Sequence, residues 1–114
     1  MHEIKKGSVV WCELEGKGSE QRGTRPCVVV SVNKINDTSS VVCVVPMTSR
    51  TKRLDLPEHI SVDWIARGHK INHSIVLCEH IKTISKERII SYGGYVKYED
   101  VLRINNGIRA LLGL

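Results

Sequence analysis

The sequence predicts a small single-domain protein that is mostly β-structure and ends in one helix. Its 114 residues are an ordinary length for one domain and are enough to bury a single core without disulfides or metals. Short runs rich in Val and Ile recur through most of the chain, separated by stretches rich in Gly, Pro and Asn, as is typical of strands joined by turns. Only the segment from Tyr98 onward has apolar residues at convincing helical spacing.

The first half of the chain contains the clearest strand patterns. Ser8–Leu14 combines β-branched and aromatic residues and is expected to form a strand. The runs 26–32 and 41–45 are apolar on both faces, so we expect them at the centre of the sheet. The turn-rich stretch 33–40 is expected to separate them. Pro46 is expected to end the second run, because proline cannot donate a hydrogen bond to a neighbouring strand.

The second half is expected to contain shorter elements. Two extended pieces, 54–56 and 59–63, lie on either side of a Pro-Glu turn, and 74–83 is expected to contain a buried strand with a short extension. One helical turn is expected at 86–90. The glycine pair within 92–95 (YGGY) predicts a break in regular structure before the helix.

The C-terminus is expected to form the only long helix. Its apolar residues recur at helical spacing, at Val101, Ile104, Ile108, Leu111 and Leu112. Glu99 and Asp100 fall in the first turn, where carboxylates suit the helix dipole. Gly107 inside the helix costs about 1 kcal/mol. Several short strands closed by one helix indicate a strongly bent antiparallel sheet or a small SH3-like barrel, formed by residues 1–114 as one domain.

The charge and hydropathy of the chain indicate which partners it binds and where in the cell it is located. Seventeen Lys and Arg against twelve Asp and Glu give a net charge of +5. A basic balance favours phosphate-bearing partners, because neutralising phosphates releases counterions. No apolar run approaches the roughly 20 residues that span a bilayer, and the N-terminus has no signal-peptide pattern. We therefore expect a cytoplasmic protein without a membrane partner.

The cysteine, histidine and tryptophan residues are given structural interpretations. The four cysteines form no C-x-x-C pair, so we expect free thiols and no zinc site. They are Cys12, Cys27, Cys43 and Cys78. The tryptophans Trp11 and Trp64 are expected to pack in the core or at an interface. The histidines expected at the surface are His2, His59, His69 and His73.

Polar segments flank the apolar runs and carry the chemically interesting residues. The stretch 15–24 (EGKGSEQRGT) is long for a hairpin connection and is a candidate functional loop. It runs into 18–26 (GSEQRGTRP), and two further segments are 46–50 (PMTSR) and 80–86 (HIKTISK). The chain has no G-x-S-x-G, Walker or H-E-x-x-H motif and no tight carboxylate pair, so neither a metal nor another cofactor is expected.

These segments resemble motifs of the MazF/PemK toxin family. G-S-E-Q-x-G-x-R-P before a Val-rich strand, then V-V-P-x-T-S and T-I-x-K-x-R, occur in family order and spacing across nearly all of the chain. The opening KGSVVW and the closing LLGL resemble the family as well. The resemblance implies an SH3-like barrel that forms a homodimer. It also implies an endoribonuclease toxin that cuts single-stranded RNA, such as mRNA, at specific sequences and is neutralised by a cognate antitoxin, expected to be an acidic peptide.

The resemblance also implies roles for particular residues. Arg25 of the R-P motif and Thr48 of the T-S motif correspond to the catalytic pair. Ser49 is expected beside the reacting phosphate. The remaining residues expected to bind RNA are Ser19, Glu20, Gln21, Thr24 and His80. Taken singly, Arg25 could equally be a solvated loop residue, and Thr48 with Ser49 could simply cap a turn; the family pattern favours the functional interpretation.

The chemistry of RNA cleavage is compatible with this pair. The RNA 2′-OH attacks the neighbouring phosphate, which gives a 2′,3′-cyclic phosphate and a free 5′-OH, and the enzyme must stabilise the extra negative charge. A guanidinium donates two hydrogen bonds to phosphate oxygens, and a threonine hydroxyl adds a neutral donor. No metal is required. Because arginine is a poor general base at neutral pH, the base is left open, with Glu20 as one candidate.

Two positions depart from the family pattern, and two other functions compete with this one. His80 stands where the family usually has Gln, which predicts an altered base preference or a pH dependence, and Ser85 stands where it usually has Asp. One alternative is a toxin of the CcdB type, which shares the fold but poisons DNA gyrase and lacks the R-P and T-S pair. The other is a nucleic-acid-binding barrel without catalysis. Neither the RNA recognition sequence nor the identity of the antitoxin follows from the sequence.

Overall fold

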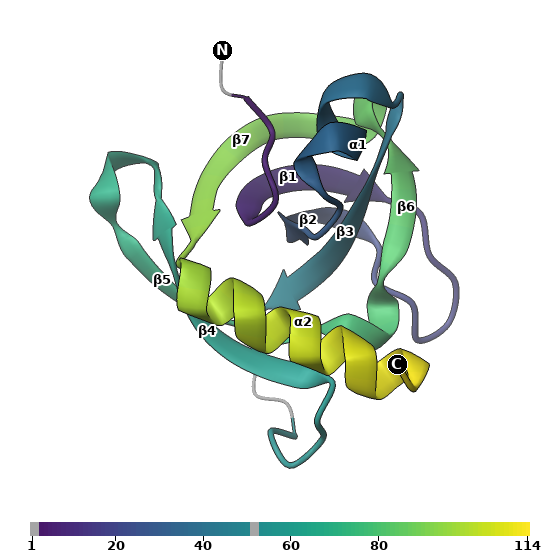
Figure 1. Ribbon diagram of the computed structural model, residues 1–114, viewed down its shortest axis with the longest axis vertical. Helices are drawn as coiled ribbons and strands as arrows, with labels where there is room; N and C mark the ends of the chain where they lie inside the picture. The colour runs from purple at the N-terminus through teal and green to yellow at the C-terminus, as the bar shows by residue number, and fades with distance from the viewer. Residues whose placement is uncertain (1–2, 51–52) are drawn as a thin grey trace.

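The computed structural model describes residues 3–50 and 53–114, so His2 lies outside the described residues. Seven strands, two α-helices and three short 3₁₀ turns make up the described part of the chain (Figure 1). The strands are β1 (Ser8–Leu14), β2 (Gly23–Val29), β3 (Val41–Thr48), β4 (His59–Ala66), β5 (Ile71–Leu77), β6 (Lys82–Ser85) and β7 (Ile89–Val96). The helices are α1 (Asn33–Thr38) and α2 (Tyr98–Leu112), and the 3₁₀ turns are η1 (Arg67–His69), η2 (Cys78–His80) and η3 (Lys86–Arg88).

The strands form one antiparallel sheet that closes into a barrel. Their order is β2-β1-β7-β4-β5-β3-β6, and an additional β2–β3 pairing joins the ends of the ring, from which β6 extends along β3. Figure 1 shows this ring of strands. The predicted mostly-β fold with one C-terminal helix and a small barrel is confirmed. A closed ring has no centre, but β2 and β3 do pair directly, through Cys27↔Pro46 to Val29↔Val44.

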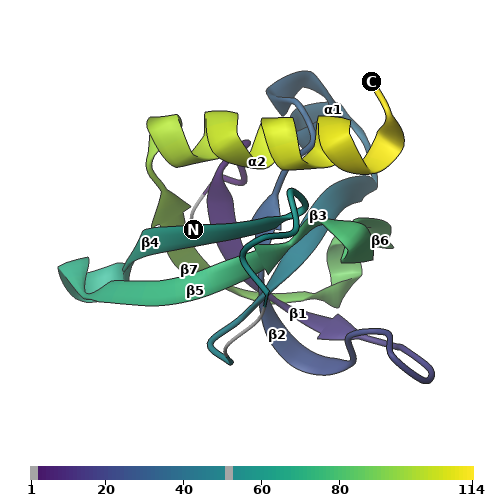
Figure 2. The same ribbon diagram turned by 90° about the horizontal axis from the view of Figure 1, so that it is seen from below.

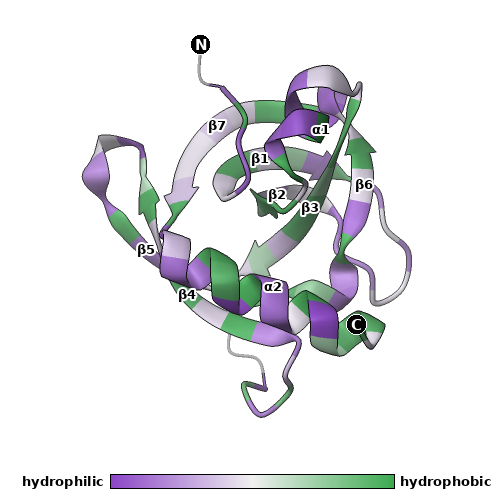
Figure 3. Cartoon of the chain, viewed as in Figure 1, coloured by the Kyte–Doolittle hydropathy of each residue, from purple (hydrophilic) through white to green (hydrophobic). Residues whose placement is uncertain are grey.

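The apolar runs in β2 and β3 face two separate cores. Val28 and Val45 belong to one buried cluster, together with Val76 and Ile104. Their neighbours along the strands, such as Val29, belong to a second cluster on the other face. Figure 3 shows β3 hydrophobic along most of its length. The prediction that both faces are buried is confirmed for 27–29 and 44–45, but β2 ends at Val29 and Val32 is 55% exposed.

Helix α2 packs across one side of the barrel as a separate layer (Figure 2). Its predicted apolar stripe is confirmed at Ile104, which is 1% exposed, whereas Leu112 is 56% exposed. A Cβ atom at Gly107 would lie 2.9 Å from the Cys78 sulfur, so the glycine allows the helix to approach η2 closely. The helix ends at Gly113, whose φ of 72° is favourable for glycine.

One predicted separator contains an unexpected helix, and two predicted breaks are wrong. The stretch 33–40 contains helix α1, held by Asn36, whose buried amide donates to the Ser31 carbonyl at 2.8 Å. Pro46 does not end its strand, because β3 changes partner there, from β6 before it to β5 after it. The expected break at 92–95 lies inside β7, where β-bulges against β1 absorb the irregularity.

The remaining elements follow the expectations in part. The extended piece at 59–63 is confirmed as part of the longer strand β4, and 54–56 lies in turns instead. The predicted strand at 74–83 is divided into β5 and β6 by η2. The four cysteines are free, and all but Cys43 are buried. No helix in the described residues is long and apolar enough to cross a membrane.

Candidate functional site

The motif residues Arg25 and Thr48 line one pocket of about 330 Å³ at the ends of the strands that carry them. We call it the Arg25 pocket. Its lining residues come from β1, β2, the end of β3 and the hairpin of β4 and β5. They are Trp11, Arg25, Pro26, Met47, Thr48, Ser49, Arg50, Trp64, Asn72, His73 and Ser74.

Strand β2 holds Arg25 in place. Arg25 pairs in register with Cys12 of β1, and two residues further on Cys27 is fully buried in the core. The half-buried Arg25 side chain donates from Nε to the carbonyl oxygen of Arg22 at 3.0 Å. The guanidinium is therefore anchored both by its strand and by the loop that precedes it. A guanidinium oriented in this way is suited to phosphate binding.

Thr48 is the last residue of β3 and is only 6% exposed. Its Oγ1 accepts a hydrogen bond from the backbone N–H of Arg50 at 3.2 Å. Thr48 does cap the turn, as the simpler interpretation of the sequence has it. A hydroxyl that accepts from an amide keeps its own proton for donation to another acceptor. The same bond orients the hydroxyl toward the segment that contains Ser49 and Arg50.

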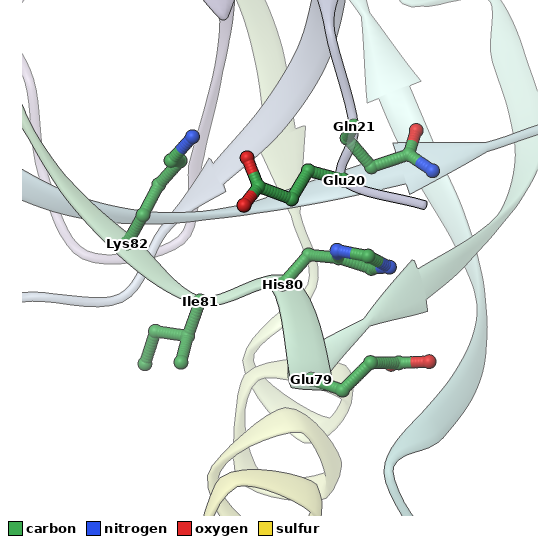
Figure 4. Close-up of a pocket in the computed structure, with 6 residues that line it drawn as sticks. All are labelled: Glu20, Gln21, Glu79, His80, Ile81 and Lys82. Atoms are coloured by element: carbon green, nitrogen blue, oxygen red, sulfur yellow. The ribbon is translucent and has the colours of Figure 1, made fainter. Parts of the chain in front are cut away.

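A second pocket, of about 250 Å³, is lined by six residues: Glu20, Gln21, Glu79, His80, Ile81 and Lys82. We call it the His80 pocket. Figure 4 shows Glu20 and Gln21 entering from the loop between β1 and β2, opposite the η2–β6 segment. The Gln21 amide, the His80 ring and the Glu79 carboxylate point to the same side, whereas Glu20 extends toward Lys82.

Backbone contacts fix the loop of the His80 pocket. Glu20 Oε2 accepts from the backbone N–H of Lys17 at 3.0 Å. Lys82 donates from Nζ to the carbonyl oxygen of Glu15 at 3.3 Å, which ties β6 to the start of the loop. The loop residues therefore have defined positions above η2. The pocket combines carboxylate, amide and imidazole groups, the kinds of side chain that can hydrogen-bond the edges of nucleobases.

The predicted site residues divide between the two pockets. Arg25, Thr48 and Ser49 lie in the Arg25 pocket. Glu20, Gln21 and His80 lie in the His80 pocket, so Glu20, the candidate base, does not line the pocket that holds Arg25. The other two predicted RNA-binding residues line neither pocket. Ser19 is exposed in the loop, and Thr24 is exposed on β2, where its hydroxyl donates to Glu13 Oε2 at 2.7 Å.

Comparison with known proteins places the chain in a family. A curated relative, Endoribonuclease MazF of Staphylococcus saprophyticus, is 30% identical over 113 residues, which cover 97% of this chain and 92% of the relative. A family model described as the PemK-like, MazF-like toxin of type II toxin-antitoxin systems matches residues 5–112. This chain belongs to that family of endoribonuclease toxins.

Solved structures of MazF toxins share the fold. MazF (Form-I) from Deinococcus radiodurans aligns over 100% of both chains with a TM-score of 0.83 and 22% identity. The MazE–MazF complex (Form-II) from the same organism aligns over 100% of this chain and 99% of that chain, with a TM-score of 0.74 and 22% identity. An endoribonuclease from a mycobacterial species, in complex with its cognate antitoxin, has a TM-score of 0.74 and 24% identity over 100% of this chain and 97% of that chain.

Sequence reasoning missed several residues of this toxin's two pockets. In the Arg25 pocket they include Arg50, Asn72 and His73, and in the His80 pocket Glu79 and Lys82. Arg50 and Glu79 stand directly beside predicted site residues in the sequence, and this adjacency was the available signal. Asn72 and His73 reach the Arg25 pocket through the pairing of β5 with β4, a long-range contact with no local signature.

The tryptophan interpretation is confirmed for Trp64 and one of the histidine interpretations is wrong. Trp64 is 4% exposed and belongs to the core, and it donates from Nε1 to Ser74 Oγ at 3.1 Å. His69 and His73 are exposed, as expected. His59, expected at the surface, is only 9% exposed. Its burial follows from its place at the start of β4, opposite Leu77 at the end of β5.

Proposed function

We propose that this family toxin cleaves single-stranded RNA at specific sequences, with mRNA as its target and without a metal cofactor. The observation that carries the proposal is that the Arg and Thr of two motifs distant in sequence line one pocket. Both side chains are oriented there by hydrogen bonds to backbone groups, Arg25 to Arg22 and Thr48 to Arg50. An mRNA target implies action in the cytoplasm.

In the proposed reaction the RNA 2′-oxygen forms a bond to the adjacent phosphorus while the bond from phosphorus to O5′ breaks. The products are a 2′,3′-cyclic phosphate and a 5′-OH. Arg25 uses Nε for the Arg22 carbonyl, which leaves its two terminal nitrogens to donate to phosphate oxygens as negative charge develops. The Thr48 hydroxyl donates a further hydrogen bond, and Ser49 lies beside the same phosphate.

Proton transfer requires a separate assignment, because a guanidinium is a poor general base. We assign to Arg25 the stabilisation of charge and the protonation of the leaving O5′ atom. Glu20 lines the His80 pocket and would serve as base only for an RNA that extends into both pockets. We propose that a neighbouring nucleotide occupies the His80 pocket, with Ser19 and Thr24 bordering the RNA outside it.

The test is cleavage of a long single-stranded RNA by the purified protein in EDTA. We expect cleavage at defined sites, with a 2′,3′-cyclic phosphate or 3′-phosphate and a 5′-OH as end groups. Loss of activity in EDTA that magnesium restores would refute the metal-independent mechanism. Retardation of RNA without cleavage would favour a binding barrel, and inhibition of DNA gyrase without RNA cleavage would favour a toxin of the CcdB type.

Assembly is part of the proposal. We propose that the toxin forms a homodimer and is neutralised by an acidic peptide segment of its antitoxin, which covers the RNA site and displaces the 15–24 loop. The net charge of +5 favours an acidic partner. We expect a dimer mass by light scattering at micromolar concentration, and competition between RNA and an acidic antitoxin peptide. A monomer under these conditions would contradict the dimer.

A further inference from the structure

A buried histidine joins the His80 pocket to a distant segment of the chain. His59 donates from one ring nitrogen, Nδ1, to the carbonyl oxygen of Arg53 at 2.6 Å. Its other ring nitrogen, Nε2, lies 2.6 Å from the Glu79 Oε2 atom. Glu79 belongs to η2 and lines the His80 pocket. His59 thus links η2 to the segment 53–58, which precedes β4.

The two partners determine the protonation state of the ring. A carbonyl oxygen and a carboxylate are both acceptors, so both ring nitrogens must carry a proton to satisfy them. A neutral imidazole has only one N–H, and with it either the Arg53 carbonyl or the Glu79 carboxylate would face a bare nitrogen. The His59 side chain is only 7% exposed, so water has little room to replace the missing bond. The geometry therefore favours an imidazolium paired with an ionised Glu79.

The charges around His59 agree with this state. Burial alone lowers the pKa of His59, but hydrogen bonds to Glu79 and to the Arg53 carbonyl, together with the charges of Glu79 and Glu58, raise it above its ordinary value. In the preceding segment, the hydrogen-bonded Arg53 guanidinium is the main cause of the lowered pKa of the Asp55 carboxyl, and the charge of His59 lowers it further. The groups that face His59 are thus mainly acidic, with Arg53 contributing its carbonyl oxygen.

Backbone hydrogen bonds place this link directly beneath the His80 pocket. Cys78 N–H donates to the Glu58 carbonyl at 3.0 Å, and His59 N–H donates to the Leu56 carbonyl at 3.0 Å. The η2 turn is therefore tied to the residue before His59 by its backbone and to His59 itself through Glu79. His80 follows Glu79 in the same turn, and both residues line the His80 pocket.

We propose that His59 is a positioning residue for RNA capture: a buried imidazolium that fastens the η2 turn to the segment 53–58, and whose loss of one proton loosens the His80 pocket. The effect on RNA rests on the proposed function, whereas the fastening does not. Because the folded-state pKa of His59 is raised, the stabilisation is complete below the ordinary histidine value of about 6.5 and is lost as pH rises through the folded-state value.

The first experiment uses the free protein, without RNA. Two-dimensional NMR of the ring nitrogens is expected to show both nitrogens of His59 protonated at about pH 6, with a titration midpoint above the ordinary histidine value of about 6.5. The backbone amides of Glu79, His80 and Arg53 are expected to shift with the same midpoint as His59 when the pH is raised. The variant Glu79→Gln keeps an acceptor and removes the charge, so it should move that midpoint to lower pH. A His59 midpoint at or below about 6.5, or η2 amides that do not follow it, would overturn the proposal.

The second experiment measures cleavage kinetics against pH in a His80→Gln background, which removes titration of His80 itself. As the pH rises and His59 loses its proton, which we call the alkaline transition, KM should rise by about tenfold. This is the value of one charged hydrogen bond, and the change in kcat should be smaller. His59→Gln should remove this transition. His69→Asn is the matched control, since His69 is exposed on η1 at a φ of 66° that asparagine tolerates, and it should keep the transition.

The outcomes separate the two proposals. If the parent protein cleaves RNA and His59→Gln keeps the same alkaline transition, the positioning role is wrong while the ribonuclease stands. If no protein cleaves RNA at any pH, the proposed function fails, and the ring-nitrogen and amide titrations still decide the state of His59. If His59→Gln does not fold, Glu79→Gln carries the test, and an unmoved midpoint in that variant overturns the proposal.

Discussion

The two pockets are built in different ways. The Arg25 pocket takes its motif residues from paired strands, with Arg25 in β2 and Thr48 at the buried end of β3. The His80 pocket lies between a loop and a 3₁₀ turn, with Gln21 on one side and His80 on the other. Strands fix side chains closely enough for chemistry, whereas loops can change in sequence without loss of the fold. The difference suggests that chemistry belongs to the first pocket and recognition to the second.

The charges of the two pockets also differ, in a way that agrees with this division between chemistry and recognition. The described lining of the Arg25 pocket contains Arg25 and Arg50 and no carboxylate. The His80 pocket contains Glu20 and Glu79 beside Lys82. Carboxylates repel phosphates but accept hydrogen bonds from the amino groups of bases, while arginines attract phosphates. The Arg25 pocket therefore suits the scissile phosphate, and the His80 pocket suits a nucleobase of the RNA.

The largest effect is expected from removing the two donors of the Arg25 pocket. Arg25→Ala and Thr48→Ala should each lower the cleavage rate by about 10²-fold or more, the usual result of deleting one donor to the transition state. Single-turnover cleavage with excess enzyme measures the step itself. Thr48→Ser keeps the hydroxyl and should retain most of the rate, which separates the role of the hydroxyl from that of packing.

The control for these variants is Arg109→Ala, which removes an exposed guanidinium of α2 that lines neither pocket. It should cleave at the rate of the parent protein. Thermal midpoints of all variants show whether the fold persists. An Arg25→Ala or Thr48→Ala protein with an unchanged midpoint and the parent rate would remove that residue from the mechanism.

A smaller effect of a different kind is expected in the His80 pocket. Gln21→Ala should raise KM by about two- to tenfold, the value of one neutral hydrogen bond, and should change which sequences are cut. Asn106→Ala, which removes an exposed amide from α2, is the matched control. Sequencing of the cleavage ends provides the measurement. A large loss of kcat with unchanged sequence preference would contradict the division between chemistry and recognition.

The sequence predicted what local patterns can encode and missed what arises from long-range pairing. Strand β1 and helix α2 were expected where they lie, because their periodicity is local. Arg25 and Thr48 were singled out by contiguous motifs and line one pocket, and their catalytic roles stay a prediction. The strand through Pro46 depends on a change of partner along β3, and the burial of His59 depends on the end of β5. No pattern around these two residues reports such contacts.

The smallest expected effect concerns the imidazole of His80 in the second pocket. Phosphates favour the charged form of a nearby histidine. RNA binding should therefore tighten by about two- to fivefold as pH falls from about 8 to 6, the size of an exposed ion pair. In a His59→Gln background, which removes the transition of His59, His80→Gln should lose this dependence and bind as its parent does at high pH. Binding titrations with uncleavable RNA, carried out at low and high salt, measure the effect and its screening.

Parallel pH profiles for the two proteins would mean that His80 only replaces the hydrogen bond of a glutamine. The His80 pocket would then differ from the Arg25 pocket in how it is built, and not in how RNA binding there responds to pH.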